Sequence, residues 1–460
     1  MNPHPVAPTD IDIRASADRV IARFRGGDAE GGFRLLERTG QSERPVVREA
    51  LDRYVAAAVL RHGDLLSQEA RAADADAAAR LERALGPPRI PDNARTADEP
   101  NELTGLTEAQ KRHVYASMVE VRGNEAARAD LLRDNHVVLL GLRRETSTLS
   151  SPGNGRARTG VYDDQVIVLG RAADGSERVF VALASTEPTA QYSHQAGSDG
   201  NRRFSGGDRE SRVIAPAPGY EAVRWRKIEG EEVNGDTMRD LGRLAEGTVE
   251  LFRAEHPNPR SVGTRDAFRP SPEQMTRTAG MVQRDTNGDG YFTPADPSGV
   301  QPLNGSFKIH SGSFHNTDSA GCQTIHPGDY RDFIQAARLN PAQTRWQYVL
   351  TSTQGGLFHN VEVGREAAPV ETTPAPADRQ DERQSNGRPV QGPFEDPGLN
   401  RYYAAVLADD SDEANRIALG FAFRAPEPLL HGAIAMRERE MASAGSDVQA
   451  HQHGAPGLHL

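Results

Sequence analysis

The spacing of the apolar residues changes near Asn135, and this change limits the possible fold more than any other feature of the chain. Before it, apolar residues such as Val20 and Phe24 recur at helical intervals with charged residues between them. After it, residues 137–142 and 165–169 form short runs rich in β-branched side chains, which are typical of strands. The sequence therefore predicts an α+β protein whose helices come first and whose strands follow.

The 460 residues are enough for several domains, and composition suggests where they divide. Residues 364–394 carry prolines among charged and polar residues with few bulky apolar groups, which predicts a disordered linker. We expect a multidomain chain with a helical N-terminal region over 1–133, a β-rich domain over 134–363, this linker, and a small helical tail over 395–460. We interpret the tail as a secretion or docking module, with an accessory helical bundle as the alternative.

Local signals mark particular helix starts and strands. Residues 107–110 form a capping-box pattern before a helix, Pro272 stands at a first helical position, and Asp329 is expected to cap a helix that carries Phe333, Ile334 and Ala337. The further strands expected are 178–183, 248–252, 307–310 and 347–351.

The chain has one cysteine, Cys322, which excludes an intramolecular disulfide framework and a cysteine-rich zinc cluster. Two histidines, His310 and His315, precede it by a few positions. The segment therefore contains a candidate nucleophile and candidate bases that could accept its proton. Gly321 lacks a side chain, which lets backbone N–H groups approach an oxyanion, and Ser319 is placed to orient the loop. The alternative is that Cys322 is a small buried apolar residue.

These residues resemble the active-site signature of the L,D-transpeptidase (YkuD-like) domain. His310 matches its base, Ser319 its Ser/Thr, Gly321 its glycine and Cys322 its nucleophile. The inner histidine of that signature is Ala320 here, and the spacer after His310 is shorter. The run Ser-x-Gly-Cys-Gln-Thr-Ile is similar to a branch of phage-related and effector-like bacterial proteins, and the resemblance covers about residues 134–355.

The resemblance implies acyl transfer on peptidoglycan stem peptides, as an L,D-carboxypeptidase or as an L,D-transpeptidase or exchange enzyme. The biological setting it suggests is that of a secreted antibacterial effector. Cys322, deprotonated by His310, would attack an L,D-peptide carbonyl, and no cofactor is needed for that chemistry. His315 stays open as an alternative base. Two other classes also stay open: a catalytically inactive cell-wall-binding or adaptor module, which Ala320 favours, and a thiol peptidase of another family.

A second motif precedes the cysteine segment and fits the register of a calcium loop. Its oxygen ligands suit a hard cation, and a structural calcium ion would brace the active site. The expected ligands are Asp285, Asn287, Asp289, Tyr291 through its carbonyl, Thr293 and Asp296. The alternative is that the Asn-Gly-Asp-Gly segment is a solvated turn without a metal ion.

Charge and targeting signals limit the partners. The net charge of −11 argues against nucleic acid as a main partner, because such binders carry a basic face. No apolar run approaches the length of a membrane span, and the N-terminus has no Sec-type signal pattern. Since peptidoglycan lies outside the cytoplasmic membrane, we expect export to the periplasm by a dedicated secretion system, with contacts to that machine or to an immunity protein.

Overall fold

The computed structural model describes most of the first 354 residues. The described ranges are 11–41, 43–63, 65–91, 101–150, 160–192, 230–235, 239–257, 264–277, 281–296, 300–314 and 316–354. The predicted linker (364–394) and helical tail (395–460) lie outside these residues, and so does His315.

Seven helices precede the first strand in the described part of the chain. They are α1 (Ile13–Arg25), α2 (Ala29–Gln41), α3 (Pro45–Arg61), α4 (Gln68–Ala73), α5 (Ala75–Ala84), α6 (Glu108–Arg122) and α7 (Glu125–Leu132). The predicted capping box is confirmed, because the Thr107 hydroxyl accepts from the Gln110 N–H and the Gln110 side chain accepts from the Thr107 N–H. Among the described residues, no helix is long and apolar enough to cross a membrane.

The strands form one closed barrel of eight strands and one small sheet of three. The barrel strands are β1 (His136–Arg143), β2 (Asp164–Arg171), β3 (Glu177–Ser185), β5 (Gly247–Pro257), β6 (Thr264–Pro270), β9 (Ile309–Ser311), β10 (Gln323–Ile325) and β11 (Arg345–Ser352), in the order β1-β11-β5-β6-β9-β10-β3-β2. The small sheet has the order β4-β7-β8 and consists of β4 (Leu241–Leu244), β7 (Val282–Asp285) and β8 (Val300–Gln301). Between these strands lie the short helices η1 (Ala190–Tyr192), α8 (Pro272–Arg277) and α9 (Pro327–Ala337). The predicted α+β class is therefore confirmed in its coarse form.

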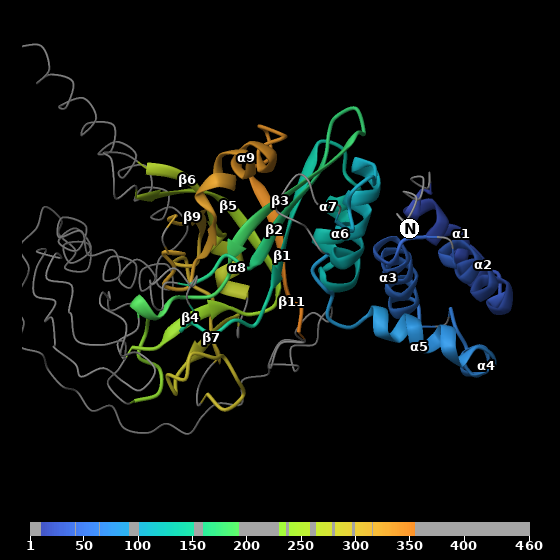
Figure 1. Ribbon diagram of the computed structural model, residues 1–460, viewed down its shortest axis with the longest axis horizontal. Helices are drawn as coiled ribbons and strands as arrows, with labels where there is room; N and C mark the ends of the chain where they lie inside the picture. Colours follow the sequence, from blue (N-terminus) through green and yellow to red (C-terminus); the bar gives the residue numbers. More distant parts are fainter. Residues whose placement is uncertain are drawn as a thin grey trace, which may run out of the picture. The chain divides into compact units, whose positions relative to one another are not determined.

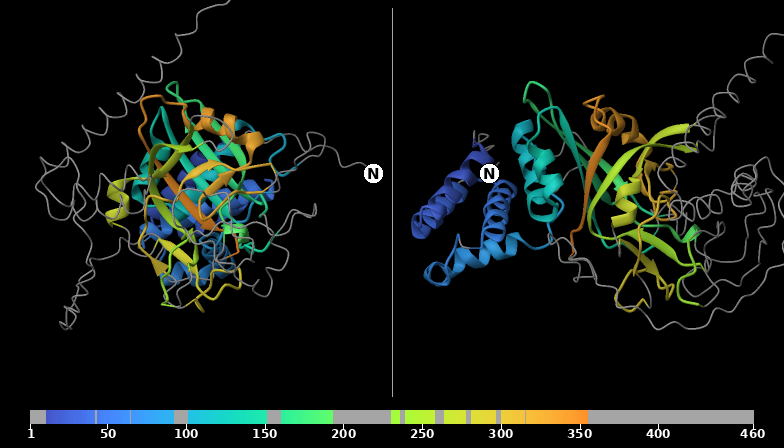
Figure 2. Two further views of the ribbon diagram at one scale, coloured as in Figure 1. Left: turned by 90° about the vertical axis from the view of Figure 1, so that its left-hand side faces the viewer. Right: turned by 180° about the vertical axis from the view of Figure 1, so that it is seen from behind.

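The strand β1 is buried on both of its faces, which explains why its sequence is an almost continuous apolar run. Val137 and Leu139 belong to the core inside the barrel, whereas Val138, Leu140 and Leu142 pack with the helices. Alternate side chains of a strand point to opposite faces, so a strand covered on both sides needs apolar residues throughout. Figure 1 shows α6 and α7 lying against this wall of the barrel, and Figure 2 shows the same layer from behind.

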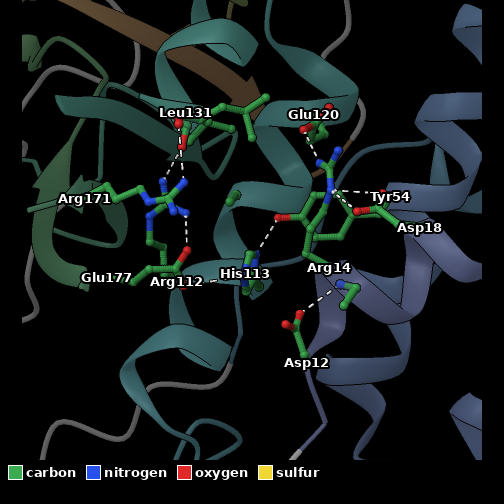
Figure 3. Close-up of a pocket in the computed structure, with 13 residues that line it drawn as sticks. Asp12, Arg14, Asp18, Tyr54, Arg112, His113, Glu120, Leu131, Arg171 and Glu177 are labelled. Carbon is green, nitrogen blue, oxygen red and sulfur yellow. Dashed lines mark hydrogen bonds and ion pairs between the residues drawn. The ribbon is translucent and has the colours of Figure 1, made fainter. Parts of the chain in front are cut away.

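A chain of polar contacts joins the helices to the hairpin β2–β3. The Tyr54 hydroxyl lies 2.9 Å from Nδ1 of His113, whose Nε2 lies 3.4 Å from a carboxylate oxygen of Glu177. Arg112 donates to the same carboxylate, and burial lowers the pKa of His113. These residues line a cavity of about 280 Å³, drawn in Figure 3. The barrel and its helical layer are therefore tied by polar groups as well as by apolar packing.

The helix α9 begins differently from the sequence prediction. His326, not Asp329, is its N-cap, and the His326 ring accepts a hydrogen bond from the Gly328 N–H. The Asp329 carboxylate instead accepts from the Leu183 N–H at 2.9 Å, which fastens the first turn of α9 to β3. The prediction was wrong because Pro327 can occupy the first helical position, which moves the cap back by three residues.

Candidate active site

Two adjacent parallel strands bring His310 and Cys322 to one face. In β9 and β10, His310 pairs with Thr324 and Ile309 pairs with Gln323, so Cys322 precedes the pairing by one residue. Side chains of paired residues point the same way, and residues two apart share a face. Cys322 and His310 are therefore on the same side, with Cα atoms separated by roughly 8 Å from strand geometry.

The His310 ring is held in one orientation. Its Nδ1 lies 2.9 Å from the carbonyl oxygen of Ser311. Because a carbonyl oxygen can only accept, Nδ1 carries the proton and Nε2 of the neutral ring is left as an acceptor. His256 of β5 stacks on the ring with centroids 3.9 Å apart. Burial, followed by the charge of His256, lowers the pKa of His310 to about 3, so the ring is neutral at neutral pH.

Cys322 is half-buried at the start of β10. Its thiol donates to the Ser306 carbonyl at 3.3 Å. The Ser319 hydroxyl spans the turn before it, donating to the Cys322 carbonyl at 2.7 Å and accepting from the Gly321 N–H at 3.1 Å. Ser319 thus fixes the backbone around the thiol, while the Gly321 N–H, expected as an oxyanion donor, is occupied by Ser319.

Gly321 has a packing role in this structure. Its φ is +136°, a conformation that side chains rarely adopt. A Cβ at this position would lie 2.4 Å from the Gly242 carbonyl oxygen of β4. The turn before Cys322 can therefore approach the small sheet so closely only with glycine at this position.

The loop between β9 and β10 is tied to segments that are distant in sequence. The Tyr162 hydroxyl contacts the carbonyl oxygens of Ser313 and Asn316, at 3.0 and 3.1 Å. The Tyr192 hydroxyl donates to the Asp318 carboxylate, and the Thr189 N–H donates to the Ser319 carbonyl at 2.9 Å. Several anchors thus position the thiol, as a preorganised site requires.

Three groups at this site were not predicted from the sequence. They are the Ser311 carbonyl, His256, and Lys308, which interacts electrostatically with Cys322. Lys308 could have been predicted from the sequence, because in a strand over 307–310 it lies on the same face as His310. His256 could not have been predicted, because the expected strand ended at Phe252 whereas β5 continues to Pro257.

The acidic loop after β7 is compact and rich in hydrogen bonds. Asp285 accepts from the N–H groups of Gly288 and Gly290, at 2.8 and 3.0 Å, and Asp296 accepts from those of Thr286 and Thr293, at 2.9 and 2.7 Å. Both carboxylates are buried, and neither forms an ion pair with a described residue.

The charge of this loop is compatible with a cation, although its side chains face the backbone. Burial, together with the charges of Asp296 and Asp289, raises the pKa of Asp285 to about 7. Asn287 and Asp289 bond to loop N–H groups, Tyr291 is exposed, and the Thr293 hydroxyl accepts from Ala295. Among the described residues, no group of three or more His, Cys, Asp or Glu side chains is arranged to hold a metal ion.

The arrangement around Cys322 can support covalent chemistry. It offers a partly accessible thiol and a neutral imidazole of fixed tautomer on one face of two paired strands. Comparison with protein-family models, with curated proteins and with solved structures finds no match for this chain.

Proposed function

We propose that the protein is a cysteine enzyme that transfers acyl groups from peptidoglycan stem peptides, as an L,D-carboxypeptidase or an L,D-transpeptidase. The observation that carries the proposal is the pairing of β9 with β10, which puts Cys322 and His310 on one face. The likeness of the His-x-Gly and Ser-x-Gly-Cys segments to the L,D-transpeptidase signature supports the substrate class. The finer description of the barrel as an L,D-transpeptidase-like domain is part of the same proposal.

In the proposed reaction, Nε2 of His310 takes the thiol proton as the Cys322 sulfur attacks the peptide carbonyl carbon. A carbon–sulfur bond forms, and the carbonyl oxygen becomes an oxyanion. The carbon–nitrogen bond then breaks while His310 returns the proton to the leaving amine, which leaves a thioester on Cys322. Attack by water gives a carboxylic acid and the free thiol, whereas attack by an amine gives a new peptide bond.

Mass spectrometry of purified peptidoglycan fragments tests this proposal. The parent protein is expected to shorten or crosslink stem peptides, and Cys322→Ala is expected to give no product, because without the nucleophile no acyl-enzyme forms. A carbapenem should add to the parent protein and not to Cys322→Ala.

The same experiment separates an enzyme from a binding module. If neither protein changes the fragments and both bind them equally, the adaptor alternative, which Ala320 favours, replaces the enzyme. A substrate outside the cytoplasmic membrane also requires export, which we propose occurs through a dedicated secretion system.

We also propose that the acidic loop binds a structural calcium ion through Asp285, Asn287, Asp289, Tyr291, Thr293 and Asp296. Hydrogen bonds connect this loop to the cysteine segment: Thr148 donates to the Gly290 carbonyl, Ala190 donates to the Thr148 carbonyl, and the adjacent Thr189 donates to the Ser319 carbonyl. A cation would offset two buried carboxylates that lack a cationic partner among the described residues.

Isothermal titration tests the calcium proposal. The parent protein is expected to bind one calcium ion and to unfold at a higher temperature when calcium is present, because a ligand that binds only the folded state stabilises it. Asp285→Asn and Asp296→Asn should each remove the binding heat, whereas Asp174→Asn, in the exposed turn between β2 and β3, should retain it. Absence of binding heat in the parent protein would end the proposal.

A further inference from the structure

A lysine stands closer to Cys322 along the strands than the proposed base does. The Gln323 N–H donates to the Lys308 carbonyl at 2.8 Å, and Ile309 pairs with Gln323, so Lys308 and Cys322 each immediately precede the first pair of β9 with β10. Neighbouring parallel strands are about 4.8 Å apart, and the charges of these two residues interact, so the two residues lie close together.

The Lys308 side chain lies on the face of the thiol. Phe307 and Ile309 belong to the core inside the barrel, so Lys308 and His310 point to the opposite side. Ile325 of β10 is also a core residue, and Gln323 shares its face, which leaves Cys322 and Thr324 on the side of Lys308. The ammonium group and the sulfur atom are thus carried on the same surface by adjacent residues.

Lys308 lacks an acidic partner in the described part of the chain. It is half-buried and forms no ion pair there. Burial lowers its pKa, the charge of Cys322 raises it, and Arg269 of β6 lowers it. The interaction with Cys322 therefore favours the charged form of this amine, whereas burial and Arg269 disfavour it.

The buried environment of His310 explains why the charge of Lys308 would matter for a thiolate at Cys322. A neutral imidazole with a pKa of about 3 holds a proton poorly, whereas an ordinary thiol has a pKa of about 8.5. A resting thiolate–imidazolium pair is therefore unfavourable, and a thiolate in this site needs another cation.

We propose that Lys308 stabilises the Cys322 thiolate and makes the site attract anionic reagents and substrates. The role of Lys308 during catalysis rests on the proposed function. In that reaction Lys308 stabilises the charge of the thiolate, and His310 transfers the proton. Lys308 is thus a further residue of the reacting centre, placed by strand register.

Alkylation of Cys322 measures this role directly. Rates with neutral iodoacetamide are followed against pH for the parent protein, Lys308→Met and Lys308→Arg. We expect Lys308→Met to raise the apparent pKa of the thiol by about one unit and to slow alkylation at pH 7 by roughly tenfold, because the stabilising charge is gone. Lys308→Arg keeps the charge and should stay within about threefold of the parent rate.

A second reagent separates charge from local structure. Anionic iodoacetate is attracted by Lys308, so its rate relative to iodoacetamide should fall in Lys308→Met. Lys111→Met is the matched control, since it removes a lysine on α6 that pairs with Glu108 at 3.0 Å. Its pH profile and reagent ratio should equal those of the parent protein.

The outcomes distinguish this inference from the proposed function. Unchanged pH profile and reagent ratio in Lys308→Met overturn the role of Lys308, even if the protein acts on peptidoglycan. A shifted profile in a protein that leaves peptidoglycan intact supports Lys308 and removes the proposed substrate, because alkylation requires no peptidoglycan.

Discussion

Replacing His310 with alanine is expected to lower kcat/KM for the proposed acyl transfer by about 10²- to 10⁴-fold, the usual contribution of a positioned acid–base group. The Ser311 carbonyl fixes the tautomer of His310, and its strand places it on the face of Cys322. Without the ring, water must take the thiol proton and return it to the leaving amine. His315→Ala is the comparison, because His315 is the alternative base; it should lose much less if His310 takes the proton, and a larger loss than for His310→Ala would assign that role to His315.

The pH dependence of the His310→Ala effect is a sharper test than its size. Burial and the charge of His256 depress the pKa of His310 to about 3, so the base remains unprotonated throughout the neutral range. The ratio of parent to variant kcat/KM should therefore be constant between about pH 5 and pH 8. An ordinary histidine titrates near 6.5, and its contribution would disappear below that pH. A ratio that falls towards 1 below pH 6.5 would contradict the buried base.

Local patterns were sufficient to predict the class of most elements. The predicted segments 137–142, 165–169 and 347–351 lie inside β1, β2 and β11, and α8 begins at Pro272 as expected. The Ser271 hydroxyl caps that helix by accepting from the Gln274 N–H at 3.1 Å. Such features depend on neighbours in sequence, and single-sequence patterns record them well.

Features that depend on strand pairing could not be predicted in the same way. The strands β4, β6, β7, β8 and β10 have weak local signals, and all of them except β6 have four residues or fewer. Its parallel pairing with β9 follows a connection without a described helix, whereas parallel strands are more often joined by helical crossovers. The contact of His256 with His310 likewise depends on how β5 closes the barrel.

In the candidate site, too, the residue types could be predicted from the sequence, whereas their tertiary contacts could not. His310, Ser319, Gly321 and Cys322 lie close in sequence, and their residue types identified them. The spacing could not show that Ser319 occupies the Gly321 N–H or that Gly242 requires a glycine at position 321. Those contacts come from tertiary packing between the cysteine turn and β4.

Arg243→Met is expected to lower the free energy of unfolding by about 3–5 kcal/mol, the cost of breaking a buried ion pair from one side. Arg243 is buried in β4 and contacts the carboxylates of Glu187, which is buried, and Glu145, which is largely buried. Its guanidinium lies 4.5 Å from the centre of the Phe292 ring, in the acidic loop. This one side chain therefore joins the barrel to the small sheet beneath the cysteine turn.

The sign of the pH dependence follows from Glu145. Burial acts to raise its pKa, but Arg243 and Arg143 together hold it below the usual value. In the parent protein the ionised carboxylate thus contributes stability above about pH 4.3, and this is lost as pH falls. Without Arg243, burial is opposed by Arg143 and no longer by Arg243, so the pKa of Glu145 rises relative to the parent protein and its ionisation contributes less stability. The stability difference between the parent and Arg243→Met should therefore increase from pH 4 to pH 7.

Urea unfolding of three variants measures this prediction. Arg253→Met is the matched control, because Arg253 is exposed and pairs with Asp266 at 2.7 Å; it should cost less than about 1 kcal/mol. Adding Glu145→Gln and Glu187→Gln to Arg243→Met should recover part of the loss, since the unpaired charges are then removed. Equal losses for Arg243→Met and Arg253→Met would show that the buried cluster contributes no more than a surface pair. A loss confined to Arg243→Met, and relieved by the two glutamines, would show that the charges beneath the cysteine turn hold the two sheets together.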